Sequence, residues 1–265
     1  MDGSELELIT REPEVAEVGS PILLVHGAWH GPWCWDDFAR RLAERGHDVR
    51  AVQLRGHDQR PGRIWHRVHH YVEDVRSAAG EFAQPPILVG HSLGGLVAQK
   101  YLENNPAAGA VLMASLPTRG TLAAIARLGA RHPLVLLKVN LLWTLRPFIA
   151  TPALVRELFF TDGTPRDVVD SCDARLQDES YLALIDTIWK RPRPRRVHVP
   201  VLVLAAEDDG FFTVGEMRRT ARAYSTEAEV FPKMGHDMML DQDWQGVADR
   251  VDAFASQTVS LGALS

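Results

Sequence analysis

The chain is poor in cysteine and has no long apolar segment. Its 265 residues include only two cysteines, Cys34 and Cys172. Two cysteines so far apart do not form a disulfide framework, so we expect no native disulfide. A membrane-spanning helix needs a run of about 18 or more apolar residues. No such run occurs, so we expect no membrane span.

An excess of positive charge is also missing. The chain has 29 lysines and arginines against 34 aspartates and glutamates, a net charge of −5. Nucleic-acid binding requires a broadly basic face, so we expect no nucleic-acid partner. The first residues, Met1 to Glu7, are acidic and lack the basic and apolar regions of a signal peptide, which favours a cytoplasmic location. We found no internal repeat and no spacing typical of metal ligands, and we expect neither metal nor organic cofactor.

Short aliphatic runs alternate with amphipathic stretches along most of the chain. Continuous apolar runs indicate strands that are buried on both faces, and apolar residues at helical spacing indicate helices between them. This alternation predicts an α/β fold with a mostly parallel central sheet and helices on both faces. The predicted strands are 21–25, 49–54, 86–89, 110–113, 200–205 and 228–231, and the predicted helices are 35–44, 71–82, 96–103, 217–224 and 244–254.

Residues 117–195 interrupt this alternation. They contain no strand-like run and are rich in leucine, alanine and aromatic residues at helical spacing. We interpret them as a helical cap inserted into a core formed by residues 1–116 and 196–265. The basic run Lys190–Arg196 would be a solvated linker back to the core. Candidates for an apolar lining of the cap are Leu136, Leu142, Trp143, Phe148, Phe159 and Phe160.

The main chemical signal is the sequence from Gly90 to Gly94, which has the pattern Gly-x-Ser-x-Gly. The pattern alone is weak, but here it follows a predicted buried strand and opens a predicted helix, as a nucleophile elbow requires. Ser92 would be the nucleophile, and the glycines would leave room for the crossing backbone. The backbone N–H of Leu93 would then form half of an oxyanion hole.

The turn after the first buried strand is the expected source of the second oxyanion donor. It reads His26-Gly27-Ala28-Trp29-His30, and the Ala28 amide is the candidate. His26 is expected to be structural. His30 and Trp29 could face the pocket.

A serine nucleophile needs a base, and the base needs an anion to orient it. His236 follows the last predicted strand, so it would lie at the same sheet edge as Ser92. Three consecutive carboxylates, Glu207, Asp208 and Asp209, follow another buried strand and are candidates for the acid. The other histidines fall in packing or solvated contexts, although His57 could line the pocket.

Taken together, these residues resemble the α/β-hydrolase superfamily from about Pro21 to Phe254. The stretch from His26 to Trp35 is locally similar to the methylesterase and hydroxynitrile-lyase branch. In many relatives the acid loop reads glycine, two residues, aspartate, three residues, proline. On this pattern Asp209 takes the aspartate place, while Ala206 and Thr213 depart from it. A nucleophile that is serine rather than aspartate argues against dehalogenase and epoxide hydrolase chemistry.

The resemblance implies a serine hydrolase that cleaves a carboxylic ester, thioester or lactone of a small hydrophobic substrate through an acyl-enzyme. Trp29, His30, Phe211 and Trp143 are the expected pocket residues. A lyase or cyclase on the same scaffold, or a ligand-binding receptor with a slow triad, remains as an alternative.

Overall fold

A computed structural model describes residues 8–12, 19–57 and 65–262. The prediction about the first seven residues lies outside this part of the chain. The described residues form a seven-stranded sheet in the order β1-β3-β2-β4-β5-β6-β7. Only β1 (Leu8–Arg11) runs antiparallel to its neighbour, β3 (Val49–Val52), and all other neighbours are parallel. The predicted fold class is therefore confirmed.

The central strands are continuous apolar runs, and every residue in them is buried. They are β2 (Ile22–Val25), β4 (Ile87–His91), β5 (Gly109–Met113) and β6 (Val201–Ala206). Burial on both faces explains why their sequences do not alternate between polar and apolar residues. The edge strand β7 (Ala228–Phe231) is half-buried. Strand β1 was not predicted, because an edge strand of four residues carries little apolar signal.

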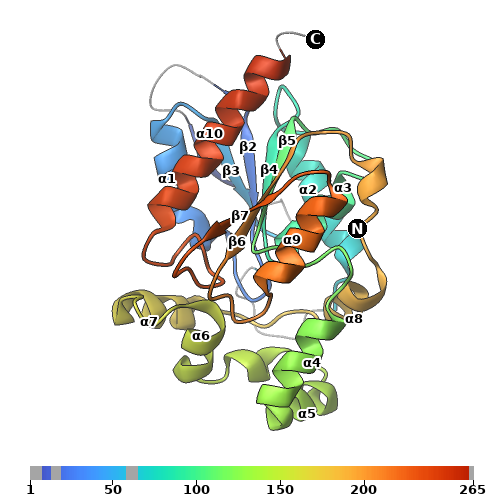
Figure 1. Ribbon diagram of the computed structural model, residues 1–265, viewed down its shortest axis with the longest axis vertical. Helices are drawn as coiled ribbons and strands as arrows, with labels where there is room; N and C mark the ends of the chain where they lie inside the picture. The colour runs from blue at the N-terminus through green and yellow to red at the C-terminus, as the bar shows by residue number, and fades with distance from the viewer. Residues whose placement is uncertain (1–7, 13–18, 58–64, 263–265) are drawn as a thin grey trace.

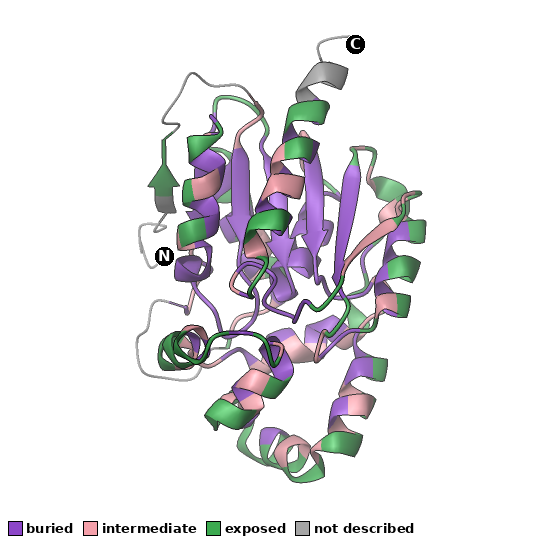
Figure 2. Ribbon diagram, turned by 60° about the vertical axis from the view of Figure 1, so that its left-hand side comes forward, coloured by how far each residue is buried: buried purple, intermediate pink, exposed green. Residues whose placement is uncertain are grey.

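Helices cover both faces of the sheet (Figure 1). Helix α1 (Asp36–Glu44), which follows the short helix η1 (Pro32–Trp35), packs on α10 (Trp244–Gly262). Helix α2 (Val68–Ala79) packs on α3 (Leu93–Tyr101), and α9 (Val214–Ala223) packs on β6 and β7. Buried residues fill the sheet and the inner helix faces, and exposed residues lie on the outer faces (Figure 2). None of the helices in the described part of the chain is long and apolar enough to cross a membrane.

Between β5 and β6 the regular elements are all helices joined by loops, and no described residue there belongs to a strand. In Figure 1 most of this segment lies beyond one end of the sheet. The backbone N–H of Gln177 donates to the Trp29 carbonyl, which ties the segment to the loop after β2. The division into a core and a cap at residues 117 and 195 stays a prediction. The helices are α4 (Leu122–Arg131), α5 (Pro133–Leu142), η2 (Arg146–Ile149), α6 (Pro152–Phe159), α7 (Arg166–Arg175), α8 (Tyr181–Trp189) and η3 (Pro194–Arg196).

Candidate active site

Ser92 occupies a strained turn between β4 and α3. Its φ of 51° and ψ of −116° lie in a region that non-glycine residues rarely adopt. The turn is tight because a Cβ atom at Gly90 would lie 2.6 Å from the Gly94 carbonyl oxygen, and one at Gly94 would collide with the Val25 carbonyl. Such strain costs about 1–3 kcal/mol, which the surrounding packing must offset. The result is a serine that is 7% exposed and borders a pocket.

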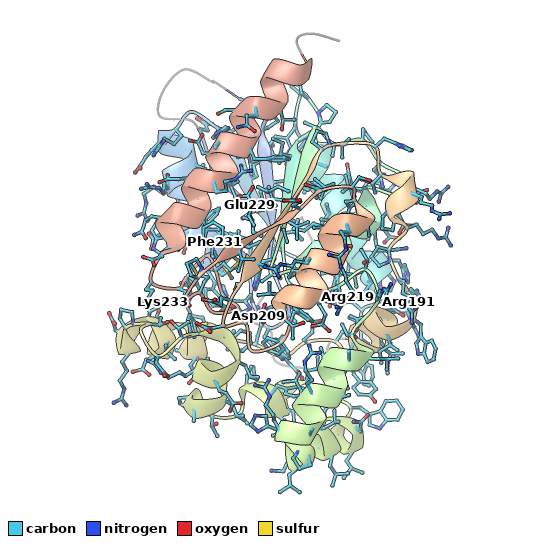
Figure 3. The ribbon with its side chains drawn as sticks, viewed as in Figure 1. Arg191, Asp209, Arg219, Glu229, Phe231 and Lys233 are labelled. Atoms are coloured by element: carbon cyan, nitrogen blue, oxygen red, sulfur yellow. The ribbon has the colours of Figure 1, made fainter. Side chains whose placement is uncertain are left out.

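His236 is held by Asp209 in the loops that follow β7 and β6. Its Nδ1 donates to Asp209 Oδ2 at 2.9 Å, which leaves Nε2 as the acceptor of the ring. Asp209 Oδ1 accepts hydrogen bonds from the backbone N–H groups of Phe211 at 2.7 Å and Phe212 at 2.9 Å. Both side chains of the pair are 1% exposed, whereas Asp208 is exposed. Figure 3 shows Asp209 between the sheet and the helices beyond its end.

His91 connects the serine turn to the His236 loop. Its Nε2 donates to the His236 carbonyl at 3.0 Å. Burial lowers the pKa of His91 well below its ordinary value, so the ring is neutral at physiological pH. Its Nδ1 then carries no proton, and it has no partner among the described residues. Because His91 precedes Ser92, this bond fixes the distance between the two loops.

Ser92 and His236 border the same aromatic residues. The His236 ring lies 4.6 Å from the Phe211 ring and 5.6 Å from the Phe212 ring, centroid to centroid. Phe211, Phe212 and Ser92 all line one pocket. Among the described residues the Ser92 hydroxyl makes no hydrogen bond to His236. Catalytic hydrogen bonds of this kind are often long in ligand-free sites and shorten when substrate binds.

The predicted oxyanion residues lie beside the serine. Ala28 and Leu93 both line the pocket together with Ser92. The loop after β2 approaches the serine so closely that a Cβ atom at Gly27 would lie 3.0 Å from Ser92 Cβ. Trp29, the next residue after Ala28, has a left-handed φ of 64°.

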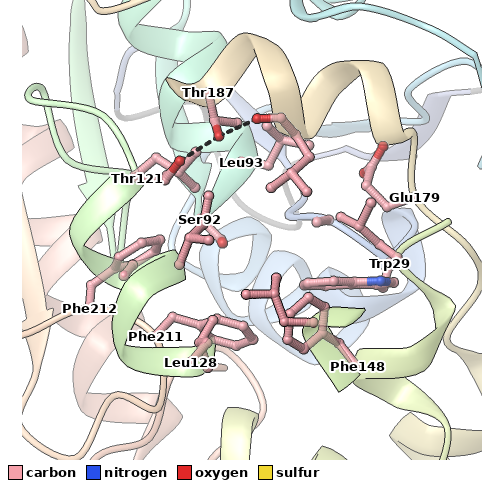
Figure 4. Close-up of a pocket in the computed structure, with 17 residues that line it drawn as sticks. Trp29, Ser92, Leu93, Thr121, Leu128, Phe148, Glu179, Thr187, Phe211 and Phe212 are labelled. Atoms are coloured by element: carbon pink, nitrogen blue, oxygen red, sulfur yellow. Dashed lines mark hydrogen bonds between the residues drawn. The ribbon is translucent and has the colours of Figure 1, made fainter. Parts of the chain in front are cut away.

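The pocket has aromatic and aliphatic walls (Figure 4). Trp29 stacks on Phe211 at 5.9 Å between ring centroids, and in Figure 4 Ser92 lies between Phe212 and Trp29. Helices α4, α5 and α8 contribute much of the wall, so the segment between β5 and β6 encloses the site. The other lining residues are Leu116, Thr121, Ala124, Ile125, Leu128, Leu136, Leu145, Phe148, Glu179, Leu184 and Thr187.

Some predicted pocket residues lie elsewhere, and these predictions need correction. Trp143 ends α5 in a left-handed conformation, is 54% exposed and packs on Tyr181 outside the pocket. Leu142 is also exposed. Phe159 and Phe160 are buried but do not line the pocket; Phe159 packs behind Trp29 and Phe211. Helical spacing alone could not show which side of each helix faces inward.

The expectation that His30 faces the pocket was also wrong. Its side chain is fully buried and does not line the pocket. Its Nδ1 donates to the Ala28 carbonyl at 2.8 Å, and its Nε2 donates to Asp237 Oδ2 at 2.9 Å. Burial lowers the pKa of His30, but the Asp237 carboxylate outweighs it, so the net shift is upward. The pKa of Asp237 is lowered correspondingly. A buried ion pair therefore ties the Ala28 loop to the His236 loop.

Cys172 of α7 completes this buried cluster. Its sulfur lies 3.8 Å from Asp237 Oδ2 and 3.9 Å from His30 Nε2, so the three donor atoms are close enough to hold a metal ion. However, both ring nitrogens of His30 donate hydrogen bonds, to the Ala28 carbonyl and to Asp237, so the ring has no free lone pair for a metal. The arrangement fits a hydrogen-bonded ion pair better than a metal site. No sequence pattern marks the cluster, because its members lie far apart in the chain.

Glu179, which was not among the predicted site residues, places a carboxylate in the pocket wall. Its oxygens accept hydrogen bonds from Tyr71 at 2.8 Å and from His57 at 3.0 Å. Burial lowers the pKa of His57, but Glu179 raises it above its ordinary value. His57 itself does not line the pocket; it lies behind Glu179. No local pattern in the sequence marks Glu179.

The sheet order and the strained serine at the end of β4 define an α/β-hydrolase fold. The chain belongs to the alpha/beta hydrolase family, because the model of that family matches residues 22–250. A solved structure of a thermophilic esterase from Thermogutta terrifontis superimposes with a TM-score of 0.74. It is 19% identical, and the match covers 97% of this chain and 96% of that one.

Two relatives are similar over shorter segments. A carbendazim-hydrolysing esterase from Nocardioides sp. (strain SG-4G) is 41% identical over 78 residues, which is 28% of this chain and 32% of that protein. Methylesterase 10 from Arabidopsis thaliana is 35% identical over 88 residues, which is 32% of each. The chain thus matches about a third of the length of these relatives.

Proposed function

We propose that this protein is a carboxylic ester hydrolase with Ser92 as nucleophile, His236 as general base and Asp209 as the acid that orients the histidine. The observation that carries the proposal is the strained Ser92 turn in a pocket whose walls include Phe211 and Phe212. Both rings pack on His236, whose Nδ1 is bound by a buried carboxylate. A neutral imidazole oriented in this way presents Nε2 as a proton acceptor. The names of the two esterase relatives support the same reaction class.

The reaction follows from these roles. Ser92 Oγ attacks the ester carbonyl while its proton passes to His236 Nε2, and the amides of Ala28 and Leu93 stabilise the oxyanion. The bond to the leaving alcohol breaks, and the alcohol takes the proton from His236. Water then attacks the acyl-enzyme and gives its proton to His236, which returns it to Ser92 as the carboxylic acid leaves. Asp209 stabilises the imidazolium in both steps.

The pocket walls support a small, hydrophobic substrate. Most of the lining residues are aliphatic or aromatic, and each methylene that leaves water for such a wall contributes about 0.8 kcal/mol to binding. The carboxylate of Glu179 is occupied by Tyr71 and His57, so it offers little to a charged ligand. We propose that residues 117–195 act as a cap that selects the acyl or alcohol group.

The test is covalent labelling with a fluorophosphonate probe, combined with hydrolysis of p-nitrophenyl esters from acetate to octanoate. Ser92→Ala and His236→Ala are compared with matched controls, the exposed Ser77→Ala and the exposed His198→Ala. We expect wild type and both controls to be labelled and to hydrolyse esters. Both site variants should lose labelling and turnover.

Three results would count against the proposal in different ways. A wild-type protein that is not labelled would mean that Ser92 is not an activated nucleophile. Labelling without turnover of any ester would retain the nucleophile and reject ester hydrolysis. A Ser92→Ala variant that still hydrolyses esters would assign the reaction to another residue.

A further inference from the structure

The outer side of α5 carries an apolar surface that nothing in the described structure covers. Leu134 is 71% exposed, Leu141 is 69% exposed, and Leu137 and Trp143 are more than half exposed. Leu134, Leu137, Lys138 and Leu141 follow helical spacing and so share one side of the helix. With Trp143 these four residues form what we call the α5 face. In Figure 1 α5 lies at the end of the molecule opposite the C-terminus.

Helix α5 is apolar on both its inner and its outer side. Val139 is fully buried and Leu136 lines the pocket, so the inner side of the helix packs against the rest of the protein. A helix that is hydrophobic all round is normally buried on all sides. Contiguous exposed apolar patches on a protein surface typically mark interaction sites. We therefore expect the α5 face to bind a partner.

The charge around the α5 face indicates which partner. Residues 117–156 contain no aspartate or glutamate, although the whole chain has a net charge of −5. Among the described residues Lys138 and Arg146 make no ion pair, and both are exposed. Glu157, the next acid along the chain, is already engaged by Arg131 and His132. The cations of this segment are Arg119, Arg127, Arg131, Lys138, Arg146 and Arg156.

A second copy of the chain fits this face poorly. In a two-fold dimer the same surface meets itself, and because residues 117–156 contain no acid, this segment of the second copy would offer Lys138 no counter-charge. Burying an unpaired charge is costly. On a lipid surface the lysine can instead extend its ammonium group to the headgroups while its methylenes stay among the acyl chains. A tryptophan at the end of the helix also suits the lipid–water boundary.

We propose that the α5 face docks this protein on the surface of an anionic lipid bilayer. The leucines would enter the acyl boundary, and Lys138 and Arg146 would contact anionic headgroups. Leu136 and Leu145 of the same segment line the pocket, so docking would bring the pocket next to the apolar phase. The binding does not depend on the proposed ester hydrolysis.

The experiment is co-sedimentation of the full chain with vesicles of phosphatidylglycerol alone and of phosphatidylcholine alone. We expect binding to phosphatidylglycerol that weakens as salt is added, and little binding to phosphatidylcholine. Lys138→Gln should weaken binding about fivefold, the effect of one basic residue near an anionic surface. Its matched control is Arg222→Gln, an exposed cation on α9, which should bind as wild type does.

A double variant, Leu137→Ser with Leu141→Ser, tests the apolar part. It should lose vesicle binding while keeping the circular dichroism spectrum and the turnover of a water-soluble ester. Trp189→Ser, an exposed apolar residue on α8, is its control. The proposal is overturned if wild type binds neither vesicle or if the double variant binds as well as wild type. It is also overturned if wild type is a dimer by sedimentation that the double variant disrupts, because a second copy would then cover the α5 face.

Discussion

At the scale of single residues, two neighbouring carboxylates differ in their surroundings. Asp208 and Asp209 are adjacent and chemically identical, yet one is exposed and the other is buried against His236. The backbone N–H groups of Phe211 and Phe212 hold Asp209 in place and leave its other oxygen for the histidine. Hydrogen bonds from backbone amides thus select which carboxylate can orient His236.

We predict that Asp209→Asn lowers kcat by about four orders of magnitude, the loss expected when the histidine is no longer held in the correct tautomer. The asparagine would keep the shape of the side chain but lose the charge. Asp208→Asn is the matched control and should keep wild-type kcat. The measurement is steady-state hydrolysis of a p-nitrophenyl ester. Similar losses in both variants would mean that the loop, not the carboxylate of Asp209, matters.

At the scale of elements, the turn from β4 to α3 shows how the position of Ser92 depends on backbone geometry. The turn is strained, and the two glycines that allow it are in contact with backbone atoms rather than with side chains. Backbone atoms within a packed sheet and helix cannot easily move aside. A glycine with open space around it, such as Gly246 in α10, has no such role.

We therefore predict opposite effects for two glycine-to-alanine changes. Gly90→Ala should lower the free energy of unfolding by about 1–3 kcal/mol, the cost of overpacking, because its Cβ would press on Gly94 and Gly95. Gly246→Ala should raise it by about 0.5–1 kcal/mol, since no atom lies within 4 Å and alanine favours the helix. Urea denaturation measures both. An unchanged free energy of unfolding in Gly90→Ala would show that the turn can accommodate a Cβ atom at this position.

The start of a helix can also depend on polar residues. Helix α9 begins at Val214, three residues before the predicted start, because Thr213 and Glu216 form a reciprocal capping box. Glu216 also binds Arg127 of α4, so this helix start is joined to the segment between β5 and β6. The apolar pattern alone does not register polar residues that extend a helix at its N-terminus.

At the scale of the whole molecule, buried histidines link stability to pH. Burial lowers the pKa of His26 and His91 well below the ordinary value of 6.5. In contrast, the pKa values of His30 and His57 are raised because each faces a buried carboxylate, which outweighs the effect of burial. The two pairs of histidines therefore have opposite effects on how stability changes with pH.

We predict that the free energy of unfolding is largest at about pH 6.5. Below that pH the unfolded chain binds protons that His26 and His91 cannot bind when folded, so stability falls as pH decreases. Above it the folded chain retains protons on His30 and His57 that the unfolded chain has released, so stability falls as pH rises through the folded pKa values. Each group contributes up to about 1.4 kcal/mol per pH unit. Urea denaturation across this range tests the prediction; a steady rise to alkaline pH would contradict it.

The sequence by itself determined the fold class, the order of the central strands and helices, and the place of the serine turn. These follow from patterns that are local in the chain: apolar runs, helical periodicity and glycines at fixed spacing. The loop pattern of the resembling family already favoured Asp209 as the partner of His236, and the two side chains are in contact. Only the tertiary structure decided that Asp208 is exposed, that His30 is buried on Asp237, and that Glu179 rather than Trp143 lines the pocket. Such contacts join residues that are distant in the chain, and they depend on which side of each helix and loop faces inward, which local patterns do not specify.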